Sequence, residues 1–93
     1  MIKTFKDEET EKVFFRQFSR KLPTDIQGVA LRKLRMLNNA QIMADLRIPP
    51  ANHLEKLTGK KSGQNSIRIN EQWRICFEWR NNSAYNVEIA DYH

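Results

Sequence analysis

The sequence predicts one small α+β domain over residues 1–93, with an N-terminal strand and two to three helices packed on a mainly antiparallel sheet. Two patterns support this. The first half of the chain repeats apolar residues at helical spacing, and the last third alternates apolar and polar residues through three stretches, as strands with one buried face do. Ninety-three residues leave room for one hydrophobic core.

The N-terminal part predicts a short strand followed by a helix. Residues 1–5 are expected to join the edge of the sheet, and Asp7 is expected to cap the helix that follows. Three apolar residues of this helix share a stripe and are expected in the core, whereas Phe15 lies outside it: Val13, Phe14 and Phe18.

The middle of the chain predicts the longest helix and then a short strand. Pro23 and the two residues after it signal the helix start, and Asn38-Asn39 signal its end. Its apolar face consists of Ile26, Val29, Ala30, Leu34 and Leu37. A further helical turn is expected over residues 41–46, a strand over residues 53–57, and a loop over residues 58–63.

The register of the last three strands follows from which side chains share a face. A three-residue loop at 70–72 pairs Ile67 with Ile75 and places Arg68 opposite Arg74. By the same reasoning, a five-residue loop at 80–84 pairs Trp79 with Tyr85 on the core face and places Ala90 opposite Arg74: the third strand then delivers the end of the chain to the arginines.

Two arginines directly opposed on a sheet repel each other unless something compensates. Glu78 and Glu88 on the same face could do so as a surface ion network, and so could a bound polyanion. These alternatives are evenly matched. The chain end favours the polyanion, because its last three residues, Asp91, Tyr92 and His93, carry groups that move protons or bind phosphate.

Charge and composition restrict the class of protein. The net charge of +5 is concentrated in residues 12–61, where eleven basic residues face three acidic ones, which favours a nucleic-acid or acidic-protein partner. No apolar run is long enough for a membrane span, no signal peptide is evident, and a single Cys76 cannot form an internal disulfide. We therefore expect a cytoplasmic protein without a membrane partner.

The available side chains point to phosphoryl chemistry without a metal or cofactor. Only His53 and His93 could serve as histidine ligands, and Cys76 lies within a predicted strand. RNA supplies its own nucleophile, the 2′-hydroxyl, so the protein needs only to orient it, hold the phosphate and move two protons. Arg68 and Arg74 are the candidates to hold the phosphate, and the acid-base candidates are Tyr92, His93 and Glu55.

The pattern S-I-R-I-N-x-x-W-R-I-x-F-x-W, the opening MIKTF and the terminal D-Y-H resemble HigB-type toxins of the RelE/ParE superfamily along residues 1–93. The likeness is closest to the GraT branch. It implies a RelE-like fold and ribosome-dependent cleavage of mRNA that inhibits translation. It also implies a HigA-like helix-turn-helix antitoxin, and operator DNA bound only through the complex of toxin and antitoxin.

The resemblance also implies site residues. The terminal trio matches as Asp91, Tyr92 and His93, but the family's histidine and lysine positions in the edge strand hold Glu55 and Thr58. The other candidates for RNA contact are His53 and Lys56, which lie two residues from those positions, and Lys60 and Lys61 in the loop. Either Glu55 acts as the base, or the activity is weaker, or Lys60 and Lys61 supply the missing charge.

Three functions stay open at this point. The first is the ribosome-dependent mRNA endoribonuclease. The second is a ParE-like inhibitor of DNA gyrase, which shares the expected fold without needing the acid-base groups. The third is an interaction module whose basic surface binds an acidic partner. Fold alone does not separate them.

Overall fold

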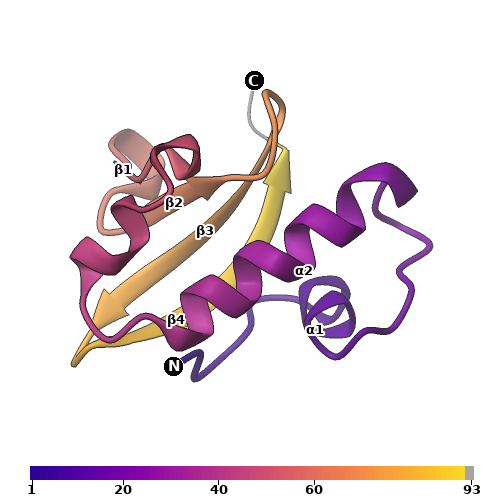
Figure 1. Ribbon diagram of the computed structural model, residues 1–93, viewed down its shortest axis with the longest axis horizontal. Coiled ribbons are helices and arrows are strands. Elements are labelled where there is room, and N and C mark those ends of the chain that lie inside the picture. The colour runs from indigo at the N-terminus through magenta and orange to yellow at the C-terminus, as the bar shows by residue number, and fades with distance from the viewer. Residues whose placement is uncertain (92–93) are drawn as a thin grey trace.

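The computed structural model describes residues 1–91 and has two α-helices on one face of a four-stranded antiparallel sheet (Figure 1). The strands are ordered β1-β2-β3-β4. The elements are α1 (Glu8–Phe14), α2 (Thr24–Asn39), the 3₁₀ turns η1 (Met43–Arg47), η2 (Pro50–Asn52) and η3 (Gly59–Lys61), and the strands β1 (Glu55–Lys56), β2 (Asn65–Arg68), β3 (Trp73–Arg80) and β4 (Ser83–Asp91). The expected α+β class is confirmed.

The N-terminal segment lies beside β4, at the edge of the sheet, as predicted. It makes two isolated parallel bridges, Ile2 with Ala84 and Phe5 with Val87. Backbone hydrogen bonds hold it there, including Lys3 N to the Ala84 carbonyl at 2.8 Å. The segment does not form a regular strand. The predicted position at the sheet edge was therefore correct, but the predicted strand was wrong.

Helix α1 begins where the sequence predicts and ends earlier. The Asp7 carboxylate accepts a hydrogen bond from Thr10 N at 2.9 Å, which caps the helix. Val13 is buried, but Phe18 is 61% exposed and the prediction that it belongs to the core was wrong. The helix ends at Phe14, and Arg16 turns the chain with a φ of 62°, so helical spacing no longer describes position 18.

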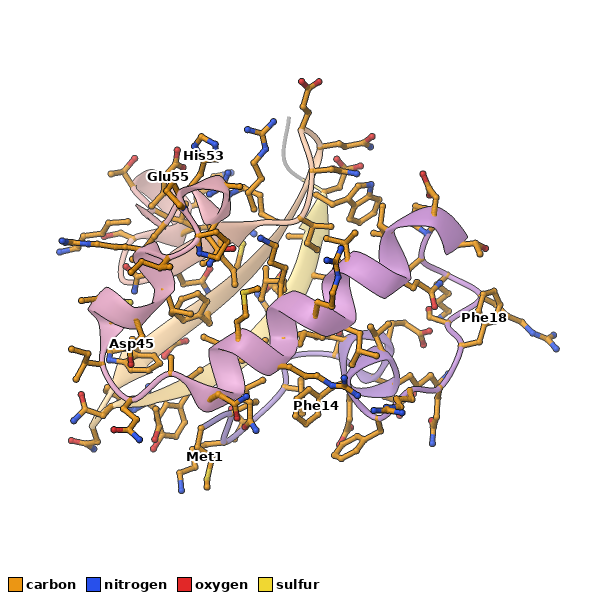
Figure 2. The ribbon with its side chains drawn as sticks, in the orientation of Figure 1. Met1, Phe14, Phe18, Asp45, His53 and Glu55 are labelled. Carbon is orange, nitrogen blue, oxygen red and sulfur yellow. The ribbon has the colours of Figure 1, made fainter. Side chains whose placement is uncertain are left out.

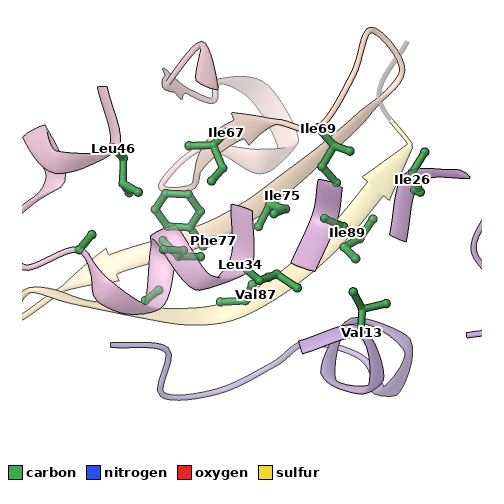
Figure 3. Packing of buried hydrophobic residues seen from close by; sticks show 14 residues of the cluster. Val13, Ile26, Leu34, Leu46, Ile67, Ile69, Ile75, Phe77, Val87 and Ile89 are labelled. Atoms are coloured by element: carbon green, nitrogen blue, oxygen red, sulfur yellow. The ribbon is translucent and has the colours of Figure 1, made fainter. Parts of the chain in front are cut away.

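The core lies between α2 and the sheet (Figure 3). Ala30, Leu34 and Leu37 of α2 are fully buried, as are Ile75 and Phe77 of β3. The predicted apolar face of α2 is thus confirmed, except that Val29 is only partly buried. The helix ends at Asn39, one of the two predicted stop residues.

Phe77→Ala is expected to lower the free energy of unfolding by about 3 to 5 kcal/mol, because Phe77 has no exposed surface and its removal leaves a cavity. Urea denaturation followed by circular dichroism measures this. Phe18→Ala is the matched control and should change stability by less than about 1 kcal/mol, since that ring is exposed. Equal losses in the two variants would contradict this placement of the core.

The segment between α2 and β2 winds through short turns. The expected helical turn after residue 40 is the 3₁₀ turn η1. Only Glu55 and Lys56 of the predicted strand 53–57 pair with β2. The strand is shorter than predicted because the backbone turns at His53, whose left-handed conformation with φ 44° lies outside the extended region.

The hairpin of β2 and β3 has the predicted register. Ile67 pairs with Ile75 and Arg68 pairs with Arg74. The Asn70 side-chain oxygen accepts from Gln72 N and Trp73 N at 2.8 and 2.7 Å, which stabilises the three-residue loop. The core face and the opposite face of these two strands are therefore those expected from alternation.

The turn between β3 and β4 is shorter than predicted. Arg80 pairs with Ser83, so the loop holds only Asn81 and Asn82, both with positive φ, which suits a two-residue hairpin. Asn86, with φ 52°, lies at a bulge that restores the predicted pairing of Ile75 with Ile89.

The bulge moves Tyr85 to the opposite face of the sheet. Tyr85 pairs with Glu78, not Trp79, and its ring lies 3.9 Å from the Arg80 guanidinium carbon. The prediction that Tyr85 shares the core face was wrong, because one extra residue in β4 inverts the alternation on that side of the bulge.

The hydrogen bond between Asn86 at the bulge and Glu78 makes the stability of the fold depend on pH. Hydrogen bonds from Asn86 and then Arg80 lower the pKa of the Glu78 carboxyl from its ordinary value of 4.5. Ionised Glu78 therefore stabilises the fold above the unfolded-state pKa, and this contribution is lost as pH falls through the lower folded-state pKa. When the pH is lowered from about 6 to about 3, the free energy of unfolding should fall less in Glu78→Gln than in wild type. Urea titrations at each pH measure this. Identical pH responses would contradict it.

No helix within residues 1–91 is long and apolar enough to cross a membrane.

Candidate active site

The candidate site is built on the sheet face that α1 and α2 leave uncovered. Arg68 and Arg74 are directly paired across β2 and β3, so both side chains leave the sheet on this face. Ser66 and Glu55 share it, because Ser66 pairs with Cys76 of β3 and with Glu55 of β1. The predicted arginine pair is confirmed.

Arg74 is held firmly and is only 11% exposed. Its Nε donates to the Ser66 hydroxyl at 2.7 Å, and its Nη2 donates to the His53 carbonyl at 2.6 Å. A guanidinium has five N–H donors, so these bonds orient the planar group and leave further donors. A fixed fork of this kind suits a phosphate oxygen.

Arg68 is more exposed, at 31%, and its head is bonded to a different part of the chain. Its Nε donates to the Asn70 carbonyl at 3.1 Å, and its Nη2 lies 3.9 Å from the Glu71 carboxylate. The two arginines therefore begin side by side on the sheet, while their guanidinium groups rest on different partners.

Within residues 1–91, Glu55 is the predicted acid-base residue, and it lies at the pair. Its carboxylate oxygen lies 3.9 Å from Arg74 Nη2, and its side chain is 57% exposed. His53 and Glu55 lie at the same corner of the molecule (Figure 2). The backbone of His53 accepts the Arg74 bond, which leaves the exposed imidazole ring at the edge of the site.

The other predicted RNA-contact residues are spread along β1 and the loop after it. Lys56 pairs with Asn65, so it leaves the sheet on the opposite face from Glu55. Thr58 and Lys60 are exposed at η3, and Lys61 Nζ lies 3.8 Å from Glu88, which Lys6 also contacts at 2.9 Å. These residues do not gather at the arginine pair.

The loop after β1 packs over part of the sheet face that the two helices leave free. Leu57, Cys76 and Ala90 form a small second cluster there and are all buried. Burial raises the pKa of the Cys76 thiol, which keeps it protonated and unsuited to act as a nucleophile. Arg68 and Arg74 lie on the same face beside this cluster, next to the turn between β2 and β3.

Asp91 ends β4 and pairs with Trp73, so it lies on the opposite face from Arg74. Its carboxylate accepts a hydrogen bond from Gln72 Nε2 at 3.1 Å. Ala90 is the residue opposite Arg74, as predicted. Tyr92 and His93 lie outside the described residues.

Two residues that contribute to the site carried no role in the sequence-based prediction. Ser66 is fully buried and orients Arg74. In the sequence, Ser66 lies two residues before Arg68 and therefore on the same strand face, which could have indicated its role. Asn52 is fully buried and holds the turn before His53, bonding the Leu46 carbonyl at 3.1 Å; no sequence pattern pointed to it.

Within residues 1–91 there is no group of three His, Cys, Asp or Glu side chains that could hold a metal ion. The groups that the described part of the site offers are two guanidiniums, a carboxylate, a buried hydroxyl and, at its edge, the His53 imidazole. They can bind a phosphate and transfer a proton.

A family model described as the RelE-like toxin of the type II toxin-antitoxin system HigB matches residues 3–93. The chain belongs to this HigB-like toxin family. It is therefore a toxin of a type II toxin-antitoxin system, with an antitoxin as its partner. The match supports the resemblance seen in the sequence, and it gives no support to the ParE-like alternative.

Curated relatives agree with the family. The chain is 43% identical to Toxin HigB-1 of Vibrio cholerae over 75% of this chain and 74% of that protein. It is 28% identical to Endoribonuclease HigB of Proteus vulgaris over the full length of both. An uncharacterized protein of Haemophilus influenzae is 42% identical over 74% of this chain and 68% of that protein.

Solved structures with a similar fold include the toxin-antitoxin complex YoeB-YefM of Staphylococcus aureus. Two such structures match the whole chain and 98% of the matched chain, with TM-scores of 0.60 and 0.56. Sequence identity is 15% and 17%, so this likeness concerns the fold. It confirms the expected RelE-like architecture.

Proposed function

We propose that this HigB-family toxin inhibits translation by cutting messenger RNA on the ribosome. RNA cleavage is supported by the family and by a relative, aligned along its full length, that is named an endoribonuclease. The single structural observation that carries the proposal is the arginine pair, Arg68 and Arg74, beside Glu55 on an uncovered sheet face. A phosphodiester needs such a cationic, geometrically fixed cradle.

The reaction in this proposal is a transfer within the RNA. The 2′-oxygen attacks the adjacent phosphorus as a base removes its proton, and the bond to the 5′-oxygen breaks as an acid protonates that oxygen. The products are a 2′,3′-cyclic phosphate and a 5′-hydroxyl. The ribosome positions the strand, and no metal ion or cofactor takes part in this scheme.

Roles follow from position and chemistry. Arg74 binds the scissile phosphate and neutralises charge in the transition state, and Arg68 holds the neighbouring part of the strand. Glu55, Tyr92 and His93 are the acid-base candidates. Asp91, whose carboxylate accepts a hydrogen bond from Gln72 Nε2, is a further catalytic candidate through the terminal trio of the family resemblance.

The remaining candidate residues for RNA contact extend the RNA-binding surface in this proposal. His53 lies at the corner of the site, Lys56 lies in the edge strand β1, and Thr58, Lys60 and Lys61 follow in the loop after it. Lys61 is partly neutralised by Glu88 at 3.8 Å, so Lys60 is the better candidate for a free charge toward phosphate.

The partner in this proposal is a HigA-like helix-turn-helix antitoxin that neutralises the toxin and, with it, binds operator DNA. The family supports an antitoxin partner. Its HigA type, and the placement of this toxin in the GraT branch, stay predictions.

The decisive experiment maps the 5′ ends of cellular transcripts after induction of the toxin, with and without an inhibitor of translation initiation. New 5′-hydroxyl ends within translated codons, lost when initiation is blocked, are expected. Uncut messages together with DNA-damage signalling would instead indicate gyrase inhibition and would overturn the proposal.

A further inference from the structure

A cavity of about 380 Å³ opens at the edge of the sheet beside the arginine pair. It lies between α2 and the segment that leads into β1. Arg68 and His53 line it from the site, Arg32 and Lys33 from α2, and its apolar walls include Met36 and Pro49. We call this space the edge cavity.

The edge cavity carries positive charge with little to offset it. Within residues 1–91, neither Arg32 nor Lys33 forms an ion pair with a carboxylate, and none of the residues that line the cavity is acidic. The carboxylate beside Arg68 belongs to Glu71, which is 96% exposed and 3.9 Å away. An exposed partner at that distance neutralises little charge.

Lys33 is fixed in place by the protein interior. Its Nζ donates to the side-chain oxygen of the fully buried Asn52. Burial first, and then the charge of Arg32, lower the pKa of the Lys33 ammonium, so an anion in the cavity would relieve an existing electrostatic cost.

The volume and the apolar walls of the cavity suit a ligand larger than a phosphate ion. Its volume lies at the lower end of the range for small-molecule sites, which combine apolar walls with a few placed polar groups. Val29, Met36 and Pro49 supply an apolar surface on which a base can rest. One nucleotide combines the anion and the flat apolar ring that this lining suits.

The edge cavity shares two residues with the candidate active site. Arg68 lines the cavity and is paired with Arg74 on the sheet. His53 also lines the cavity, while its carbonyl accepts the bond from Arg74. A strand whose phosphate lies on Arg74 would therefore reach the cavity with its neighbouring nucleotide.

We propose that the edge cavity binds the nucleotide next to the scissile phosphate, with Arg32, Lys33 and Arg68 on its phosphate and the apolar wall against its base. The identity of the strand rests on the proposed function. Binding of a nucleotide to the free protein does not, so the two can fail separately.

The test is an amide NMR titration of the ¹⁵N-labelled protein with adenosine 5′-monophosphate, adenosine and inorganic phosphate. We expect the nucleotide to bind in the millimolar range and to shift amides around Lys33, Met36 and His53. Adenosine and phosphate alone should each bind at least about tenfold more weakly, because each lacks half of the contacts.

Arg32→Glu should weaken nucleotide binding at least about tenfold, since it reverses a charge that lines the cavity. Arg35→Glu is the matched control: it makes the same change on an exposed position of the same helix, but Arg35 lines a different hollow, between α1 and α2. Its binding should stay within about twofold of wild type.

Three results would overturn the inference: amide shifts confined to other surfaces, equal affinity for adenosine and its monophosphate, or equal weakening by the two variants. Ribosome-dependent cleavage is measured on the same proteins. Nucleotide binding in the cavity without cleavage would refute the proposed function and support the cavity as a nucleotide site. Cleavage without binding in the cavity would support the proposed function and refute the cavity as a nucleotide site.

Discussion

Arg74→Ala is expected to reduce cleavage of ribosome-bound mRNA by at least about 100-fold, because it removes the oriented donors for the charge that develops on the phosphate. Arg74 is the best fixed cation of the site, bonded to Ser66 and to the His53 carbonyl. The measurement is single-turnover cleavage of a defined mRNA on purified ribosomes, together with growth after induction.

Two further variants separate charge, geometry and folding. Arg74→Lys keeps the charge and loses the planar fork, so it should recover only a small part of the activity. Arg80→Ala removes an exposed arginine from the same strand, one that pairs with Glu78 at 2.8 Å, and should leave cleavage nearly unchanged. Full activity of a folded Arg74→Ala protein would show that another group holds the phosphate.

Deletion of Tyr92 and His93 is expected to reduce cleavage by about 10² to 10⁴-fold, the usual contribution of a positioned acid-base group. It removes no residue of the described sheet, in which β4 ends at Asp91 paired with Trp73. The thermal unfolding temperature and antitoxin binding should therefore stay close to wild type. The same single-turnover assay gives the loss, and circular dichroism and co-purification give the controls.

Asp91→Asn is the informative comparison for the deletion. Its carboxylate lies on the face opposite Arg74 and accepts a bond from Gln72, which the amide oxygen of asparagine can still accept. We expect at most a few-fold loss of cleavage. A loss as large as that of the deletion would mean that Asp91 itself takes part in the chemistry, as the terminal trio of the family resemblance implies.

Local patterns predicted most of what lies close in sequence. The Asp7 cap, the apolar face of α2 and the pairing of Arg68 with Arg74 each depend on neighbours a few residues apart or on strict alternation through one short hairpin. The exposed Phe18 shows where this reasoning stops. Helical spacing predicts burial only while the helix continues, and α1 ends four residues earlier.

The hairpin of β3 and β4 shows the same limit in a sheet. Alternation alone fixes a register only when neither strand has an extra residue, and the bulge at Asn86 is such a residue. Three asparagines with positive φ, at 81, 82 and 86, carried the signal, because asparagine is among the few residues that adopt this conformation readily. The prediction followed the alternation of apolar residues instead of the asparagines, and it therefore placed Tyr85 on the wrong face.

By itself, the sequence determined the fold class, the family likeness and the face on which the two arginines meet, because these depend on periodicity and residue type. Only the tertiary structure decided that Asp91 lies on the opposite face from Arg74, that Lys61 is engaged by Glu88, and that Lys33 and Arg32 of α2 line a cavity with Arg68. Residues far apart in the chain become neighbours only through packing, and no local pattern records which of them will meet.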